Sequence, residues 1–313
     1  MEEKDFLTMA ELNPDELEYI LELSKKFKTG RDNGYGKDFL ESKQFALVFE
    51  KPSTRTRVSF QVAINELGGN PITLSSSELQ LGRGETIEDT AKVLSRYVHC
   101  IMARVISHSS IVKLANYSTV PVINGLSDLY HPVQILADLL TLKEKKGELK
   151  GLNVAWVGDG NNVCNSWLIG ASLSAINLRV ATPKGYQPLE EALTLASKIS
   201  EKTGASIFLT EDPLEAVKDA DCVMTDTFVS MGFDKEREKR MSVFMPKYQV
   251  NGSLFSHAKR DAIFMHCLPA HRGEEVTEEV IDGPNSVVFD QAENRLHTTK
   301  ALLSFMMRGI QKD

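Results

Sequence analysis

The sequence has few cysteines, and their spacing matches no common metal or redox motif. Only four occur in 313 residues; none forms a C-x-x-C pair, and none lies at zinc-ligand spacing with a pair of histidines. We therefore predict no metal site. Cys100 and Cys222 lie in apolar runs, which is typical of buried thiols. The four cysteines are Cys100, Cys164, Cys222 and Cys267.

Long apolar runs and an excess of positive charge are also missing. No stretch approaches the ~18–20 apolar residues of a membrane span. The formal net charge is -7, so the surface offers nucleic acid no broad basic face. The first residues are charged and no apolar core follows them, unlike a secretory signal. We expect a soluble protein of the reducing cytoplasm, with neither a membrane nor nucleic acid as a partner.

Short apolar runs alternate with amphipathic segments along most of the chain, which is long enough for two domains. Such alternation produces parallel sheets with helices on both faces, so we predict an α/β fold of two domains, each a mostly parallel sheet flanked by helices. Glycines at 147 and 151 follow a long helix predicted over 131–146, and we place the domain boundary after residue 147. The predicted strands are 44–49, 100–105, 120–124, 153–157, 178–181, 206–209, 221–225 and 263–266.

The most specific single pattern is Ser-Thr-Arg-Thr-Arg at residues 53–57, between a predicted strand and a predicted helix. Amides at a helix N-terminus are unpaired and carry partial positive charge, so they bind anions. Hydroxyl groups add neutral donors, and a guanidinium adds a bidentate charged fork that fits phosphate. A capped helix with solvated arginines has the same pattern. The place at a carboxyl strand end favours a phosphate site.

A histidine, His131, stands at the entrance of the long predicted helix, in the sequence His-Pro-Val-Gln. The positive end of the helix dipole lowers the pKa of an imidazole there and favours its neutral form. A neutral imidazole N–H can polarise a carbonyl oxygen, although most isolated His-Pro pairs only cap a helix.

Three polar turns follow predicted strands in the second half of the chain. Residues 158–162 (Gly-Asp-Gly-Asn-Asn) resemble a dinucleotide-binding turn, but Val163 replaces the third glycine, which argues against NAD. Residues 226–232 begin with an acid that can bind a cationic group or cap a loop. Cys267 follows a strand as a nucleophile or a small lining residue, and His271 leaves a Cys–His pair open.

Together these segments resemble the aspartate/ornithine carbamoyltransferase family, nearly from end to end. Residues 53–57 and 131–134 are similar to its two carbamoyl-phosphate motifs, and residues 226–232 and 266–269 to turns of its ornithine-type members. The resemblance implies that carbamoyl phosphate is bound by Ser53, Thr54, Arg55, Thr56, Gln80, Arg104, His131, Gln134, Cys267, Leu268 and Arg295. It implies that ornithine is bound by Asn162, Asp226, Ser230 and Met231.

The activity implied by the resemblance is transfer of the carbamoyl group of carbamoyl phosphate to the side-chain amine of L-ornithine. The products are L-citrulline and phosphate, which places the reaction in arginine metabolism. Arg104, His131 and Cys267 are the implied catalytic residues. Because carbamoyl phosphate is already activated, we expect no metal and no organic cofactor.

The resemblance also implies an organisation. The first domain, 1–147, binds carbamoyl phosphate and is completed by a C-terminal helix, 291–313, while 148–290 bind ornithine and long helices join the two. The implied assembly is a homotrimer or a multiple of trimers, with Gln80 in the loop 77–85 reaching the phosphate in a neighbouring subunit. Phe228 stands where Trp is common in the family, an aromatic-for-aromatic change.

Other functions stay open. Within the family, the acceptor can be putrescine or another amine, but putrescine has no α-amino or α-carboxylate group for the Ser-Met-Gly loop at 230–232 to recognise. A non-catalytic sensor of carbamoyl phosphate or an amino acid is the second alternative. A dehydrogenase is the third, and the incomplete glycine fingerprint counts against it.

Overall fold

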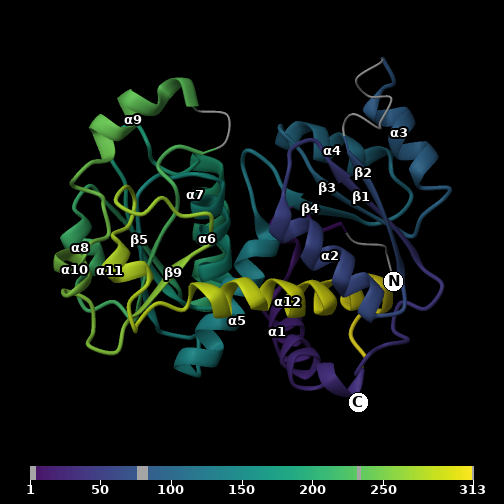
Figure 1. Cartoon of the computed structure of the whole chain (residues 1–313), viewed down its shortest axis with the longest axis horizontal. Coiled ribbons are helices and arrows are strands. Elements are labelled where there is room, and N and C mark those ends of the chain that lie inside the picture. The colour runs from purple at the N-terminus through teal and green to yellow at the C-terminus, as the bar shows by residue number, and fades with distance from the viewer. Residues whose placement is uncertain (1–4, 76–83, 231–233, 312–313) are drawn as a thin grey trace. The chain divides into compact units, whose positions relative to one another are not determined.

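The chain folds into two compact units (Figure 1). The structure is a computed structural model that describes residues 5–75, 84–230 and 234–311. Unit 1 comprises Met1–Leu140 and Glu293–Asp313, and unit 2 comprises Thr141–Ala292. Each unit is described below by itself.

Unit 1 is built on a four-stranded parallel sheet in the order β2-β1-β3-β4. The two central strands, β1 and β3, are buried almost throughout, which matches their continuous apolar sequences. They pair in register, so that Phe49 and Arg104 lie side by side at their carboxyl ends. The strands are β1 (Gln44–Phe49), β2 (Asn70–Ser75), β3 (Cys100–Arg104) and β4 (Val122–Leu126).

Three helices of unit 1 begin at side chains that cap them. Asn13 and Glu16 form a capping box at the start of the first long helix, with Pro14 in its first turn, and Ser53 and Thr86 cap two others. The helices are α1 (Pro14–Thr29), α2 (Thr54–Glu66), α3 (Ile87–Leu94), α4 (His108–Tyr117), α5 (Pro132–Lys146) and α12 (Val288–Arg308), with 3-10 turns η1 (Met9–Glu11) and η2 (Arg31–Asn33).

Unit 2 contains a five-stranded parallel sheet in the order β7-β6-β5-β8-β9. Its strands are β5 (Asn153–Val157), β6 (Asn177–Ala181), β7 (Ser206–Thr210), β8 (Cys222–Thr225) and β9 (Ile263–His266). Its other elements are α6 (Asn162–Leu173), α7 (Glu190–Thr203), α8 (Pro213–Val217), η4 (Asp234–Glu236), α9 (Arg237–Phe244), α10 (Gly252–Phe255) and α11 (Glu278–Ile281).

Strand order locates the place in each sheet where a ligand is expected. In unit 1 the order reverses between β1 and β3, and in unit 2 it reverses between β5 and β8. At such a point, connections leave neighbouring strands toward opposite faces and open a crevice at the carboxyl ends. The polar turns after β1, β3, β5 and β8 therefore lie where ligands of parallel sheets usually bind.

The predicted α/β class with two parallel sheets is confirmed, and some boundaries are corrected. Helix α2 begins at Thr54 rather than at the predicted residue 58, so most of residues 53–57 form its first turn. The two compact units divide in the sequence between Leu140 and Thr141, inside α5, and the functional boundary after 147 stays a prediction. Strand β2 and the short helices α8, α9, α10 and α11 are additions to the prediction. Among the described residues, no helix is both long and apolar enough to span a membrane.

Candidate active site

The first turn of α2 presents the predicted anion-binding residues of unit 1. Ser53 is the N-cap, and its hydroxyl accepts a hydrogen bond from the amide of Thr56 at 3.3 Å. Within this turn Thr56 is buried, Arg55 is half-buried and Arg57 is exposed. Arg55 and Arg57 therefore differ in environment although both belong to the motif, and only Arg55 is partly enclosed by the protein.

Arg295 joins three elements of unit 1. It is 3% exposed and comes from the part of α12 that belongs to this unit. Its Nη1 donates to Oε1 of Gln134 on α5 at 2.6 Å, and its Nη2 donates to the hydroxyl of Thr56 on α2 at 3.2 Å. The amide of Gln134 is oriented by its own donation to Asp138 Oδ1 at 2.7 Å. Three predicted carbamoyl-phosphate residues thus form one buried network.

His131 lies within electrostatic reach of three arginines. It is 5% exposed, immediately before α5. Burial lowers its pKa well below the usual value, and the positive charges of Arg295, Arg104 and Arg55 lower the pKa further. The imidazole is therefore neutral near pH 7 and can donate a hydrogen bond without adding positive charge. Four predicted residues, Arg55, Arg104, His131 and Arg295, thus interact electrostatically. They come from the start of α2, the end of β3, the start of α5 and α12.

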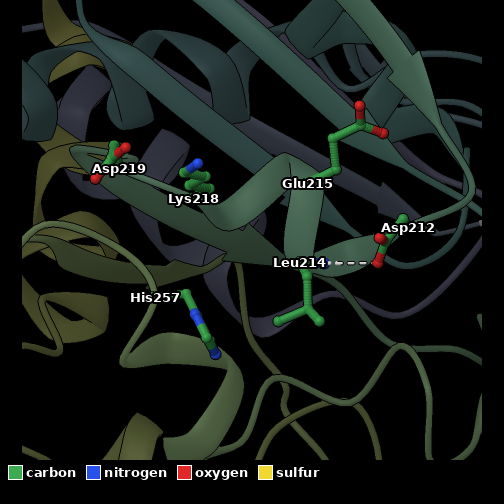
Figure 2. Close-up of a pocket in the computed structure, with 6 residues that line it drawn as sticks. All are labelled: Asp212, Leu214, Glu215, Lys218, Asp219 and His257. Carbon is green, nitrogen blue, oxygen red and sulfur yellow. Dashed lines mark hydrogen bonds between the residues drawn. The ribbon is translucent and has the colours of Figure 1, made fainter.

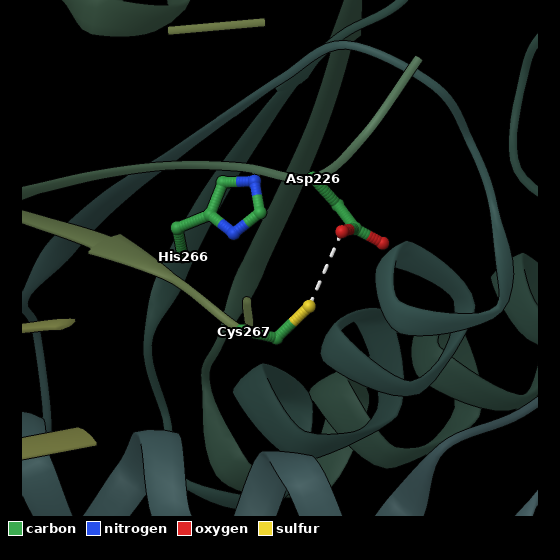
Figure 3. A group of neighbouring side chains, drawn as sticks. All are labelled: Asp226, His266 and Cys267. Carbon is green, nitrogen blue, oxygen red and sulfur yellow. Dashed lines mark hydrogen bonds between the residues drawn. The ribbon is translucent and has the colours of Figure 1, made fainter. Parts of the chain in front are cut away.

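Asp226 is the centre of the polar group in unit 2. It follows β8 and is 6% exposed. Its Oδ2 accepts from Nδ2 of Asn161 at 2.7 Å, and its Oδ1 accepts from the thiol of Cys267 at 3.2 Å (Figure 3). Asn161 is also the N-cap of α6, since its Oδ1 accepts from the amides of Val163 and Cys164. The turns after β5, β8 and β9 are therefore joined through one carboxylate.

The turn that carries Cys267 has an unusual backbone. Leu268 has φ of +55°, a left-handed conformation that is strained for a residue with a branched side chain. Its amide donates to Nδ1 of His266 at 2.9 Å, which holds this conformation in place. Strained backbone of this kind is concentrated at functional sites.

A buried arginine, Arg240, holds two of the turns of unit 2. Its Nη2 pairs with the carboxylate of Asp159, and its Nε donates to the carbonyl of Phe228 at 2.5 Å. Burial raises the pKa of Asp159, the charge and hydrogen bond of Arg240 oppose this increase, and nearby Asp226 adds to it, so that the pKa is about 6. Arg240 thus connects the turn after β5, through Asp159, to the turn after β8, through Phe228. Asp226 belongs to the second of these turns.

Both parts of the sequence match models of one known family. Residues 4–144 match the family model described as aspartate/ornithine carbamoyltransferase, carbamoyl-P binding domain. Residues 150–306 match the model described as aspartate/ornithine carbamoyltransferase, Asp/Orn binding domain. The chain belongs to the aspartate/ornithine carbamoyltransferase family.

Relatives and solved structures agree with this membership. A protein of Carboxydothermus hydrogenoformans named ornithine carbamoyltransferase is 54% identical over 304 residues, 97% of each chain. One of Pyrococcus furiosus named ornithine carbamoyltransferase, anabolic, is 53% identical over 308 residues, 98% of each chain. The solved ornithine carbamoyltransferase of P. furiosus superposes with a TM-score of 0.94 at 54% identity, covering 99% of this chain and 98% of that one.

In this carbamoyltransferase the structure brings most of the predicted residues into two groups. The unit 1 group contains Thr56, Gln134 and Arg295 through hydrogen bonds, and Arg55, Arg104 and His131 through electrostatics. The unit 2 group contains Asp226 and Cys267, with Leu268 next to them. Asn162 and Ser230 are half-buried beside these turns in sequence. Gln80 and Met231 lie outside the described residues.

The open Cys–His pair of the sequence analysis is resolved differently by the structure. The thiol of Cys267 donates to Asp226, whereas Nδ1 of His271 lies 3.2 Å from the hydroxyl of Thr227. The carbamoyltransferase site therefore pairs its cysteine with a carboxylate. A thiol that donates to a carboxylate is held in its protonated form, which differs from the thiolate of a cysteine nucleophile.

Two residues of the unit 2 group were missed from the sequence. Asn161 donates to Asp226, and Arg240 comes from helix α9, 14 positions after Asp226 in the sequence. The signal for Asn161 was present, because Asn is a preferred N-cap directly before a helix. No local pattern indicates Arg240, since its burial depends on the aromatic rings of Tyr186 and Phe244, which lie 5.0 and 5.5 Å from its guanidinium.

The side chains of Asp226, His266 and Cys267 also have the composition of a metal site (Figure 3). One potential ligand atom of each lies within 4.8 Å of the others. However, Nδ1 of His266 already accepts from Leu268, and its Nε2 lies 3.2 Å from Glu275. Metal binding by this histidine would break one of these contacts.

A surface hollow of about 600 Å³ lies elsewhere in unit 2 (Figure 2). It contains none of the predicted site residues, and three of its six lining residues are acidic. The lining residues are Asp212, Leu214, Glu215, Lys218, Asp219 and His257.

Proposed function

We propose that this chain is an ornithine carbamoyltransferase that forms L-citrulline and phosphate from carbamoyl phosphate and L-ornithine. The hydrogen-bonded pair of Asp226 and Cys267 carries the proposal, because both residues lie in ornithine-type turns of a chain that belongs to this family. The relatives that are more than half identical over nearly the whole chain carry the same name.

The phosphate of carbamoyl phosphate binds at the N-terminus of α2. Amides of the first turn, the hydroxyls of Ser53 and Thr54 and the guanidinium of Arg55 supply the donors. This arrangement favours negative charge, which increases on the phosphate as it leaves. Support comes from the cap geometry and from the partial burial of Arg55, which strengthens its electrostatic interactions.

The carbonyl oxygen is polarised by Thr56, Arg104 and His131. A neutral His131 is suited to this role, because the site already contains several guanidinium groups and a further cation would be repelled. Gln134 and Arg295 hold Thr56 and contribute to the electrostatic field. A donor to a developing oxyanion typically contributes about 10²–10³ to kcat.

Ornithine is recognised by the turns of unit 2. Asp226 binds the positively charged α-amino group, while Asn162, Ser230 and Met231 hold the rest of the amino-acid end. The carboxylate of Asp226 is oriented for this role by Asn161, which donates to Oδ2, and by Cys267, which donates to Oδ1.

The attacking amine must be neutral. Its pKa in water resembles that of lysine, about 10.4, so the site has to favour the neutral form or accept a proton. The neighbouring Asp226 and Cys267 are the groups of unit 2 best placed to interact with that proton. The amine nitrogen then bonds to the carbonyl carbon, the bond from that carbon to the phosphate oxygen breaks, and the proton that the nitrogen loses ends on the released phosphate, which leaves as hydrogen phosphate.

A single assay tests the proposed function. Purified protein is incubated with carbamoyl phosphate and either ornithine, putrescine or aspartate, and the carbamoylated product and phosphate are measured. We expect citrulline and phosphate in equal amounts with ornithine. Faster turnover with putrescine would indicate the amine carbamoyltransferase instead. Ligand binding without product in any arm would indicate a sensor.

We propose further that the enzyme is a cytoplasmic homotrimer acting in arginine biosynthesis. The word anabolic in the names of the P. furiosus and Campylobacter jejuni relatives supports the direction. Val58 and Ile72, which are 51% and 43% exposed, are apolar side chains that a subunit contact would cover. Light scattering should give three times the chain mass of 34.8 kDa or a multiple of that value. The proposal keeps Gln80, which lies outside the described residues, as a carbamoyl-phosphate ligand supplied by a neighbouring subunit.

A further inference from the structure

The carboxylate of Glu275 is fully buried below the turn that carries Cys267. Its side chain is 0% exposed, although burying a charged group is unfavourable unless partners compensate. Its Oε1 accepts from the amide of His271 at 2.6 Å and lies 3.2 Å from Nε2 of His266. Its Oε2 has no hydrogen-bond partner within the part of the chain that the structure describes. A buried carboxylate with one oxygen that lacks a hydrogen bond destabilises the fold, which points to a functional role in positioning the neighbouring turn.

The two contacts of Glu275 bracket the turn. His266 directly precedes Cys267 at the end of β9. The irregular segment that follows β9 contacts Glu275 a second time at His271, whose amide donates to Oε1. Between them lie the thiol that donates to Asp226 and the left-handed Leu268. The carboxylate therefore contacts the segment at both ends, and the strained backbone lies between the two contacts.

His266 transmits this contact to the backbone of the turn. Its imidazole is 0% exposed, its Nδ1 accepts from the amide of Leu268, and its Nε2 faces Glu275. These directions require the proton on Nε2 when the ring is neutral. The amide of Leu268 therefore sets this ring form. Nε2 and Oε1 of Glu275 are 3.2 Å apart without the alignment of a hydrogen bond, so Glu275 favours the same ring form through electrostatic attraction.

Electrostatics agree with this geometry. Burial by itself raises the pKa of Glu275, but the imidazole of His266, whose Nε2 lies 3.2 Å away, and the hydrogen bond from the amide of His271 outweigh burial and hold the pKa below its usual value. The group is consequently a carboxylate at neutral pH and interacts with both ends of the turn.

We propose that Glu275 is a positioning residue for the reaction, which acts through His266 and the amide of His271 to hold Cys267 and Leu268 in place. The inference rests on the proposed function for its kinetic consequence. It predicts that neutralising Glu275 loosens the turn, weakens the contact of Cys267 with Asp226, and impairs the chemical step more than the binding of carbamoyl phosphate.

The first measurement does not depend on activity. Cys267 is half-buried, whereas the other three cysteines are buried, so mild alkylation with iodoacetamide reports on Cys267. In Glu275→Gln the alkylation rate should rise about 5–10-fold, the factor expected when a thiol loses about one hydrogen bond. Cys267→Ala should remove the fast-reacting thiol and confirm the site of labelling.

The second measurement is kinetic. Glu275→Gln should lower kcat about 10–100-fold, as expected for misplaced catalytic groups, with the KM for carbamoyl phosphate nearly unchanged. The matched control is Glu274→Gln, since Glu274 pairs with Arg237 at the edge of the same segment and should leave both readouts at the wild-type level. His266→Asn keeps an acceptor near Nδ1 but removes Nε2, so it should resemble Glu275→Gln. The double variant should be no worse than either single variant.

Wild-type alkylation and kcat in folded Glu275→Gln would overturn the inference, as would fully additive effects in the double variant. If Glu275→Gln does not fold, His266→Asn decides by the same two readouts. A wild-type protein that forms no citrulline would overturn the proposed function instead, and the alkylation comparison would still test the positioning role of Glu275.

Discussion

At the scale of single residues, the pKa of His131 is lowered as the sequence predicts, but mainly by a different cause. The sequence predicts a lowered pKa from the dipole of the helix that follows the residue. The structure gives a lowered pKa whose first cause is burial, followed by Arg295, Arg104 and Arg55. A sequence can place a histidine at a helix entrance, but it cannot show which charges from distant segments surround it.

The lowered pKa of His131 has a consequence for stability. In the unfolded chain the imidazole binds a proton near its usual pKa of about 6.5, whereas in the folded protein it stays neutral to lower pH. The unfolded state then binds more protons, so the folded state loses stability as the pH falls below about 6.5. We expect urea unfolding to show a smaller loss of stability between pH 8 and pH 5.5 in His131→Asn than in the wild type.

His131→Gln serves as the second variant for this comparison, because its larger side chain leaves less empty space in the buried site. Both variants should reduce the pH dependence. Equal losses of stability in the wild type and in both variants would show that the ring does not remain neutral in the folded protein.

Other residue roles follow directly from chemistry that a sequence contains. Ser53 is predicted at the start of a helix and is its N-cap, and Asp226 is predicted at a strand end and lies there. The contacts of Arg295 with Thr56 and Gln134 join positions far apart in sequence. Only the family resemblance indicated Arg295, because no local pattern distinguishes an arginine that enters a site from one that faces solvent.

At the scale of secondary-structure elements, strands inside the sheets were predicted accurately, whereas one edge strand was missed. The interior strands β1 and β5 have the predicted bounds, since a short apolar run bounded by polar turns is a strong strand signal. Strand β2 was missed because it lies at the edge of its sheet, begins with Asn70 and Pro71, and is only partly buried. Edge strands carry mixed, polar sequences of this kind, which resemble loops.

The start of helix α6 shows how one cap serves two purposes. Asn161 stabilises the helix through its side-chain oxygen and orients Asp226 through its side-chain nitrogen. Asn161→Ser keeps a good capping group but removes the amide that reaches Asp226. We expect the stability to change by less than about 1 kcal/mol, because Ser and Asn cap almost equally well. The KM for ornithine should rise about tenfold, as for the loss of one charge-assisted hydrogen bond of about 1.5 kcal/mol.

Asn251→Ala is the matched control for this cap. Asn251 caps the short helix α10 of the same unit through a bond from the amide of Leu254 at 2.9 Å. Its removal should lower the stability by about 1 kcal/mol and leave the KM for ornithine unchanged. An Asn161→Ser protein that lost stability but kept its KM would contradict the second role of the cap.

At the scale of the whole molecule, the residues proposed to bind the two substrates lie mainly in two units with separate sheets. Each unit has its own switch in strand order and its own group of polar residues at the carboxyl ends. The acidic net charge of -7 contrasts with the local cluster of arginines in unit 1, which favours one small anion over a polyanion. The alternation of strands and helices predicts two units with separate sheets, whereas it does not predict the hydrogen-bond networks within each unit.

The division predicts that defects in the two groups are separable. Arg55→Ala should weaken the binding of inorganic phosphate measured by calorimetry, and should remove the stabilisation of about 2.7 kcal/mol that phosphate gives the wild type at 100 times its Kd. Asp226→Asn, which keeps the shape of the side chain, should retain phosphate binding and stabilisation but raise the KM for ornithine. The reason is that the first variant removes a cation of unit 1 and the second removes an anion of unit 2.

Each variant has a matched control, a residue of the same type that lies nearby in the sequence but outside the proposed site. Arg57→Ala removes an exposed guanidinium from the same helical turn as Arg55 and should bind phosphate like the wild type. Asp221→Asn changes a carboxylate that precedes β8 and pairs with Lys259 at 2.7 Å, and should leave the KM for ornithine unaltered. Loss of phosphate binding in Asp226→Asn, or an unchanged KM for ornithine in that variant, would contradict the assignment of the amino-acid end of ornithine to unit 2.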